Sequence, residues 1–298
     1  MAGKKDKAAL SPDSESLESE ARATTRGVVL IALRHPAWGK WAWNLTVSIF
    51  YHSKIHVQLV CDNAAISHLN EFQRSLFTQI TKMNPADYHT NNRFSAAKAK
   101  LSVYDYLACD ENLFLDVDAV CVNPLEPLFT GDIFKAHSSQ TMLWANPADV
   151  KQHFNIDTLP SINSSLMLIK RGKEAKNLFR EAKRLIEKSP FDIKKSPIRW
   201  YGGQPDELYM NVALAKQGID PNYKGLNPLY CRWKGEGGIM PTLTDIRRGH
   251  QLIGLWGHPN SVHTKIFKLY DALMIKYLKE LYGINHVYMA HQLIRQKA

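Results

Sequence analysis

The sequence of 298 residues contains only four cysteines, and they lie far apart. Cys61, Cys109, Cys121 and Cys231 form no C-x-x-C pair, so neither a zinc cluster nor a disulfide scaffold is indicated. We therefore expect a reduced, cytoplasmic protein, with peripheral attachment to a membrane as an open alternative.

Long hydrophobic runs are also missing. No run of about 18 apolar residues exists, so no transmembrane helix is expected. Residues 1–25 are rich in Ser, Glu, Lys and Ala and have no apolar core, which predicts a disordered tail rather than a signal peptide. Apolar residues make up 45% of the chain and charged residues 22%, so wholesale disorder, collagen and coiled coil are excluded.

Acidic residues are too few to balance the basic ones, and the net charge is +10. The excess is local: residues 170–200 carry 11 Lys and Arg against four Asp and Glu, and residues 264–298 carry six against two. A local basic surface attracts phosphates, nucleic acid or an acidic membrane. A solvated helix face explains the same pattern, and both interpretations stay open.

The first half of the chain alternates strand and helix patterns. Short apolar runs at 27–33, 55–61 and 112–115 are typical of buried parallel strands. Helical patterns cover 38–51, 64–82 and 96–108. This order predicts an α/β fold with a doubly wound, mostly parallel sheet flanked by helices.

The second half is less regular. Further strands are expected at 141–145, 165–169 and 251–256, and helices at 173–188, 205–216 and 265–281. Because no long linker is evident, we expect one domain over residues 26–263 and a C-terminal helical extension over 264–298.

The strongest chemical signal is Asp116-Val117-Asp118, which follows the apolar Phe114-Leu115. In open α/β sheets, ligands bind beyond the carboxyl ends of the strands. Two carboxylates spaced i, i+2 at that edge can converge on one hard divalent cation that also takes phosphate oxygens. A strand that simply ends at a turn, where Asp is favoured, is the alternative.

With this motif and its neighbours, the sequence resembles the GT-A-fold glycosyltransferases, in particular the retaining group that contains glycogenin and the bacterial lipopolysaccharide galactosyltransferases. Five landmarks occur in the family's order between Gly27 and about Lys265. The resemblance implies a hexosyltransferase that moves a sugar from a UDP-hexose to a hydroxyl acceptor with retention. It also implies Mn²⁺ or Mg²⁺ as the cofactor.

The resemblance assigns donor binding to several segments. One aromatic residue after the first strand would stack on uracil, with Trp38 preferred over Trp41, although core packing is the alternative for both. The family often has an acid in this turn, where this chain has Arg34 and His35. The full expected donor-binding set is Ala32, Leu33, Trp38, Trp41, Lys98, Asp116, Val117, Asn163, Ser164 and Lys265.

For the metal, the resemblance implies Asp118 as a direct ligand, and Asp116 as a ligand of the metal, the ribose or both. His258 is the expected third ligand and His263 its rival.

In the segment from Gly202, Asp206 and Asn211 keep the family's spacing while Glu207 replaces the usual Gln. Asp206 and Glu207 are thus implied as the catalytic residues near the anomeric carbon. A plain helix N-terminus, which favours Pro and acids, is the alternative.

Two other function classes stay open: a nucleotidyltransferase of related fold, and a non-catalytic module that binds polyanions. The loop after the first strand has only one Gly, a poor match to the first of these. For the acceptor, the basic segments suggest a polyanion such as modified DNA, or a lipid-linked saccharide at a membrane surface.

Overall fold

A computed structural model of the full chain describes residues 24–90, 93–138, 146–188, 205–230, 243–255 and 264–284. Nearly all of the expected tail and the expected strand at 141–145 lie outside these residues. The side chains of residues 245–246 and 264–268 lie outside them too.

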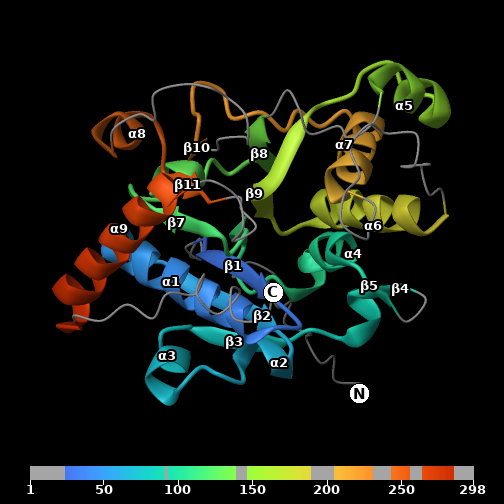
Figure 1. The fold of residues 1–298 in the computed structure, drawn as a ribbon. Coiled ribbons are helices and arrows are strands. Elements are labelled where there is room, and N and C mark those ends of the chain that lie inside the picture. Colours follow the sequence, from blue (N-terminus) through green and yellow to red (C-terminus); the bar gives the residue numbers. More distant parts are fainter. Residues whose placement is uncertain are drawn as a thin grey trace, which may run out of the picture.

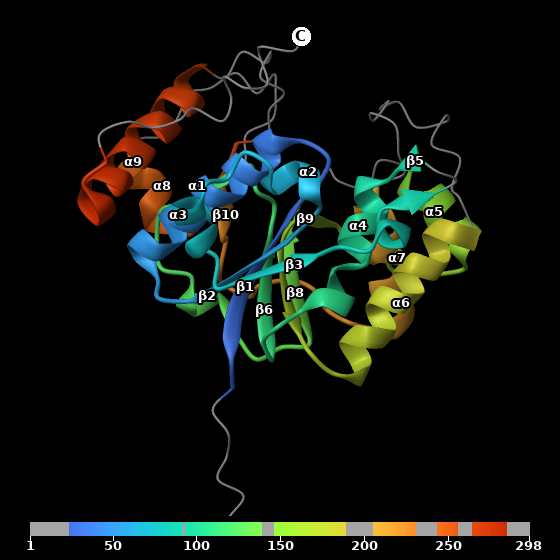
Figure 2. The same cartoon turned by 90° about the horizontal axis from the view of Figure 1, so that it is seen from below.

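The centre of the molecule is a six-stranded sheet with the order β3-β2-β1-β6-β9-β8 (Figures 1 and 2). The four strands from β3 to β6 are parallel to one another, and β9 runs antiparallel to both β6 and β8. The strands are β1 (Arg26–Ala32), β2 (His56–Cys61), β3 (Gln79–Lys82), β6 (Glu111–Leu115), β8 (Phe134–Ser138) and β9 (Ile162–Lys170). The predicted α/β class with a mainly parallel sheet is confirmed.

Helices cover both faces of this sheet, and the two faces bury alternate residues of its strands. Val28 and Leu30 of β1 belong to one core cluster, while Val29 belongs to the other. Figure 2 shows the first face covered by α1 and α9 and the second by α4, α6 and α7. These helices are α1 (Pro36–His52), α4 (Ala96–Leu101), α6 (Lys173–Lys188), α7 (Asp206–Gln217) and α9 (Thr264–Tyr282).

Smaller elements connect these layers. A second sheet has the order β10-β11-β7, and β4 pairs with β5 in a short hairpin. The remaining bounds are α2 (Asn63–Ile66), α3 (Glu71–Ser75), β4 (His89–Thr90), β5 (Arg93–Phe94), β7 (Ala119–Cys121), α5 (Pro147–Phe154), β10 (Leu229–Tyr230), α8 (Leu243–Gly249) and β11 (Leu252–Gly254); the 3₁₀ turns are η1 (Pro85–Asp87), η2 (Val103–Tyr106) and η3 (Glu126–Leu128). No described helix is both long and apolar enough to cross a bilayer.

The helix predicted over 64–82 is wrong. The structure has two short helices there, α2 and α3, followed by the edge strand β3. Asn70 forms a capping box with Gln73, which starts a new helix in the middle of the expected one. The last four residues then pair with β2, a tertiary interaction that overrides local helical periodicity.

The helix predicted as a C-terminal extension packs against α1. Asn44 Nδ2 donates to the Tyr270 hydroxyl at 2.7 Å, and the rings of Tyr51 and Tyr277 stack with centroids 4.1 Å apart. Tyr270 and Tyr277 are buried in the same cluster as β1. This helix therefore completes the cover of one face of the sheet.

Candidate active site

The Asp116–Asp118 turn is held by backbone hydrogen bonds on both sides. The amide of Asp116 donates to the carbonyl oxygen of Ser165 at 2.9 Å, and the amide of Leu255 donates to that of Asp118 at 2.7 Å. The first bond continues the β6–β9 pairing and the second continues the β7–β11 pairing. The sequence pair Asp-x-Asp is thus fixed at the point where the two sheets meet.

Lys100 lies at the centre of the polar groups around this turn. Its Nζ donates to Asp116 Oδ2 at 2.8 Å and to Ser164 Oγ at 3.1 Å, and lies 3.9 Å from Asp206 Oδ2. The Ser164 hydroxyl in turn donates a hydrogen bond to Glu207 Oε1 at 2.9 Å. One ammonium group on α4 therefore links the turn after β6 with β9 and α7.

The position of Glu207 is set by the first turns of α7. Four residues further on, Asn211 is fully buried, and its Oδ1 accepts a hydrogen bond from the amide of Ile162 at 3.2 Å. This bond ties α7 to the start of β9, so that Glu207 faces Ser164 two residues along the same strand. The motif spacing from Asp206 to Asn211 thus has a structural meaning here.

Negative charge exceeds positive charge at this edge. The charge of Lys100 acts on Asp116, Asp206 and Glu207, and also on Asp118. Burial, with the charge of Asp116 added, raises the pKa of Asp118 to about 6. Burial and the charge of Asp206 raise the pKa of Glu207 to about 8. Four carboxyl groups thus share one described ammonium.

These residues fit a hard divalent cation. Carboxylate oxygens are the ligands such ions prefer, and a surplus of buried negative charge is what a cation neutralises. Among the described residues, no three His, Cys, Asp or Glu side chains form a complete metal site. The expected third ligand, His258, and its rival His263 lie outside the described residues, three and eight positions beyond Leu255.

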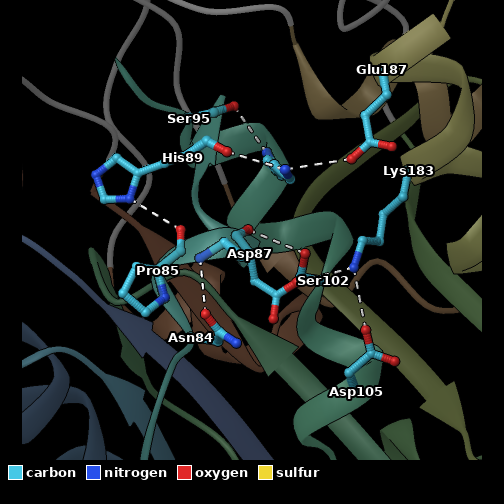
Figure 3. A network of polar contacts seen from close by, with 11 residues as sticks. Asn84, Pro85, Asp87, His89, Ser95, Ser102, Asp105, Lys183 and Glu187 are labelled. Carbon is cyan, nitrogen blue, oxygen red and sulfur yellow. Dashed lines mark hydrogen bonds and ion pairs between the residues drawn. The ribbon is translucent and has the colours of Figure 1, made fainter. Parts of the chain in front are cut away.

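Lys98, expected to contact the donor, has other partners. Its Nζ donates to the carbonyl oxygen of His89 at 3.1 Å and lies 3.4 Å from Glu187 Oε1. Figure 3 shows these groups in a network that also joins Lys183 of α6 to Asp87. Lys98 therefore fastens α4 to α6, while Lys100 faces the carboxylates.

The sequence does not distinguish these two lysines. Residues two apart on a helix point in nearly opposite directions, so only one of them can face the carboxylates. Both side chains are largely buried, with 15% of Lys98 and 19% of Lys100 exposed, and both lie among the buried Ala97, Ala99 and Leu101. Which lysine reaches the acids is decided by how α4 packs against α6 and α7.

The two tryptophans in α1 have different surroundings. Trp41 is 3% exposed and its ring lies 5.1 Å from that of Tyr270, so it packs in the core. Trp38 is 38% exposed and lies in the first turn of α1, just beyond the carboxyl end of β1. Of these two tryptophans, Trp38 alone presents an exposed ring.

An acid that follows β2 lies beside the turn after β1. Arg34 adopts a left-handed backbone, with φ of 71°, and its amide donates to Asp62 Oδ2 at 2.8 Å. The Arg34 guanidinium lies 4.7 Å from the ring centroid of Phe94. Asp62 at the end of β2 thus supplies a carboxylate beside the turn that carries Arg34 and His35.

The remaining expected residues are placed as follows. The Ser165 hydroxyl donates a hydrogen bond to Asp116 Oδ2 at 2.8 Å, a contact that sequence reasoning missed. Asn163 is buried and its Oδ1 accepts from the amide of Ser165 at 2.8 Å. Ala32 and Leu33 are buried where β1 ends, and Val117 is buried between the two aspartates. The side chain of Lys265 lies outside the described residues.

Solved structures of low sequence identity share this architecture. The galactosyltransferase LgtC, solved with donor and acceptor sugar analogues, is 14% identical with a TM-score of 0.56, and the match covers 90% of this chain and 99% of that one. The bifunctional glycosyltransferase WbbM is 14% identical with a TM-score of 0.59, over 97% of this chain and 53% of that one.

The glycosyltransferase GlyE of Streptococcus pneumoniae is 12% identical with a TM-score of 0.53, over 87% of this chain and 63% of that one. No protein-family model matches the chain, and no curated protein sequence matches it. The chain therefore has the GT-A glycosyltransferase fold, and the predicted resemblance is confirmed at the level of the fold.

Proposed function

We propose that this protein is a metal-dependent glycosyltransferase that moves a hexose from a UDP-sugar to a hydroxyl acceptor with retention. The observation that carries the proposal is the convergence of Asp116, Asp206 and Glu207 on Lys100, beside Asp118, at the carboxyl end of β6. That is the edge at which open α/β sheets bind their ligands.

On this proposal, Asp118, Asp116 and His258 hold one Mn²⁺ or Mg²⁺ ion. When bound, such an ion neutralises the charge that develops on the leaving diphosphate. Lys265 is proposed to contribute positive charge toward the same diphosphate. What supports His258 as the third ligand is its place in the sequence. It follows Leu255 by three residues, and the amide of Leu255 donates a hydrogen bond to the carbonyl oxygen of Asp118.

The donor is proposed to lie across the ends of β1 and β6. Trp38 stacks on the uracil, because its ring is exposed, whereas Trp41 packs in the core. Base stacking on an aromatic side chain contributes about 1–3 kcal/mol. The backbone of Ala32, Leu33 and Val117 lines the nucleotide.

Asp206 and Glu207 are proposed to face the anomeric carbon. Lys100 Nζ lies 3.9 Å from Asp206 Oδ2, while Ser164 orients the Glu207 carboxyl through the 2.9 Å hydrogen bond. An ionised carboxylate beside the anomeric carbon stabilises an oxocarbenium-like transition state. We further propose that Lys100 takes the part expected of Lys98, since it alone of the two reaches these acids.

The experiment that tests this function is a hydrolysis screen of UDP-sugars with Mn²⁺, comparing the wild type with Asp118→Ala. Slow release of UDP from one donor, abolished by the substitution, is the expected result and identifies the sugar. Hydrolysis of no UDP-sugar, or hydrolysis unchanged in Asp118→Ala, would contradict the proposal. Preference for free nucleoside triphosphates would point to a nucleotidyltransferase instead.

Two further points complete the proposal. The free thiols of Cys61, Cys109 and Cys121 are buried, which suits a reducing compartment, and we propose a cytoplasmic location. The net charge of +10 favours an anionic acceptor.

A further inference from the structure

The exposed side of α6 carries a row of cations that the proposed reaction does not use. Lys176, Arg180, Arg184 and Lys188 follow one another at intervals of four residues, and all four are exposed. The row extends about 18 Å along the helix axis from its first to its last member. Figure 2 shows α6 at the outer edge of the layer formed with α4 and α7. We call these four residues the α6 row.

The row is not arranged to stabilise its own helix. Cations four residues apart repel each other, and the row contains three such pairs in succession. One stabilising pair is present, Glu181 with Arg184 three residues later. No Glu in α6 lies four residues before a Lys or Arg. If these charges served only to solvate the helix, opposite charges at that spacing would be expected.

Most of the row also lacks acidic partners. Arg184 pairs with Glu181 at 2.7 Å. Within the described part of the chain, no carboxylate lies within ion-pair distance of Lys176, Arg180 or Lys188, and Arg180 donates to Asn177. These three charges therefore remain available to an external anion.

The row leads toward the candidate active site. Glu187, next to its last member, forms an ion pair at 3.4 Å with Lys98 of α4. Two residues further along α4, Lys100 contacts Asp116. A long ligand on the row would thus reach the side of the molecule on which α4 presents Lys100.

The apolar side of α6 is not available to lipid. Leu178, Phe179 and Leu185 are at most 2% exposed and pack in the core. A helix that binds a membrane surface buries an apolar face among the acyl chains, and α6 has none left for that purpose. A hydrated polymer of phosphates, which needs only spaced cations, fits this surface better.

We propose that the α6 row binds the phosphodiester backbone of a single-stranded nucleic acid and directs it toward the active site. This rests on the proposed function only in taking the bound strand as the acceptor. Binding itself requires no metal and no sugar donor.

The test measures binding of the full chain to a fluorescent oligothymidylate of about 16 nucleotides by anisotropy, at about 50 mM and about 200 mM salt. The variant Lys176→Gln, Arg180→Gln, Lys188→Gln removes three charges from the row. We expect at least roughly tenfold weaker binding and a salt slope smaller by about 2 than in the wild type.

A matched control removes two Lys and one Arg elsewhere: Lys54→Gln, Lys224→Gln, Arg248→Gln, all exposed in the structure. This control should bind the oligonucleotide as the wild type does. The proposal would be overturned if both triple variants lost oligonucleotide affinity equally, or if the α6 variant kept the affinity of the wild type. It would also be overturned if vesicles of phosphatidylserine and phosphatidylcholine bound through the row while the oligonucleotide did not.

The same variants separate this inference from the proposed function. Hydrolysis of the UDP-sugar should be unchanged in the α6 variant, and oligonucleotide binding should be unchanged in Asp118→Ala. Failure of the oligonucleotide arm alone leaves the transferase proposal standing, and failure of hydrolysis alone leaves the binding surface standing.

Discussion

The amide of Leu255 donates a hydrogen bond to the carbonyl oxygen of Asp118 at 2.7 Å. These residues are far apart in sequence, and the bond exists because β11 runs antiparallel to β7 directly after the Asp-x-Asp turn. The chain beyond Leu255 therefore starts beside the aspartates. The proposed ligand His258 follows Leu255 by three positions in the sequence.

Replacement of Lys100 should damage both stability and activity. Lys100→Gln leaves Asp116, Asp206 and Glu207 without the ammonium they share, which we expect to cost on the order of 2 kcal/mol or more in the free energy of unfolding. Donor hydrolysis should be lost as well. Denaturant unfolding and the hydrolysis assay measure the two effects.

Lys98→Gln is the matched control two residues away. Its ion-pair partner Glu187 is 47% exposed, so the free energy of unfolding should fall by less than about 1 kcal/mol. Donor hydrolysis should persist. If both variants behaved alike, the distinction between the two lysines would be wrong.

The two tryptophans should separate binding from stability. Trp38→Ala should weaken UDP binding by about 1–3 kcal/mol with little change in unfolding, because the side chain is 38% exposed. Trp41→Ala should destabilise the fold by about 3–5 kcal/mol, because it empties a core site beside Tyr270. Calorimetric titration with UDP and denaturant unfolding decide between them. Unchanged UDP affinity in Trp38→Ala would remove it from the donor site.

The contact between α1 and α9 should weaken in acid through His52. Its Nε2 lies 3.0 Å from the Tyr277 hydroxyl, and burial, with Arg247 and Lys276 nearby, lowers the His52 pKa from 6.5 to about 4. Between these pH values the unfolded chain binds more protons than the folded one. The free energy of unfolding should therefore fall as the pH drops from 6.5 to 4, by up to about 1.4 kcal/mol per pH unit from this residue.

His52→Gln is the comparison for that pH dependence. The difference between wild type and variant should shrink as the pH falls through this window and stay constant above 6.5. Unfolding curves at several pH values measure it. Two stability profiles that run parallel from pH 6.5 to 4 would show that His52 does not titrate as its surroundings imply.

The elements best predicted from the sequence are those whose pattern is local. The helix expected over 173–188 has the same bounds in the structure, because its apolar residues recur with helical spacing and all face one layer. The strand expected at 27–33 is confirmed as β1, shifted by one residue.

The features that could not be predicted from the sequence depend on contacts between distant segments. β3 was missed because pairing with β2, not local periodicity, makes residues 79–82 a strand. The β7–β11 pairing, which joins Asp118 to Leu255, has no local signature either. In the candidate site, Asp116, Ser164 and Glu207 could be identified as site residues from the sequence. The hydrogen bonds that connect them through Lys100 could not be predicted.

The most direct test of the account is calorimetric titration of UDP into the protein with Mn²⁺ and with a chelator. The account predicts binding that requires Mn²⁺, is lost in Asp118→Asn and in His258→Ala, and persists in the control His263→Ala. UDP binding of equal strength with and without the metal, or full metal-dependent binding in Asp118→Asn, would contradict it.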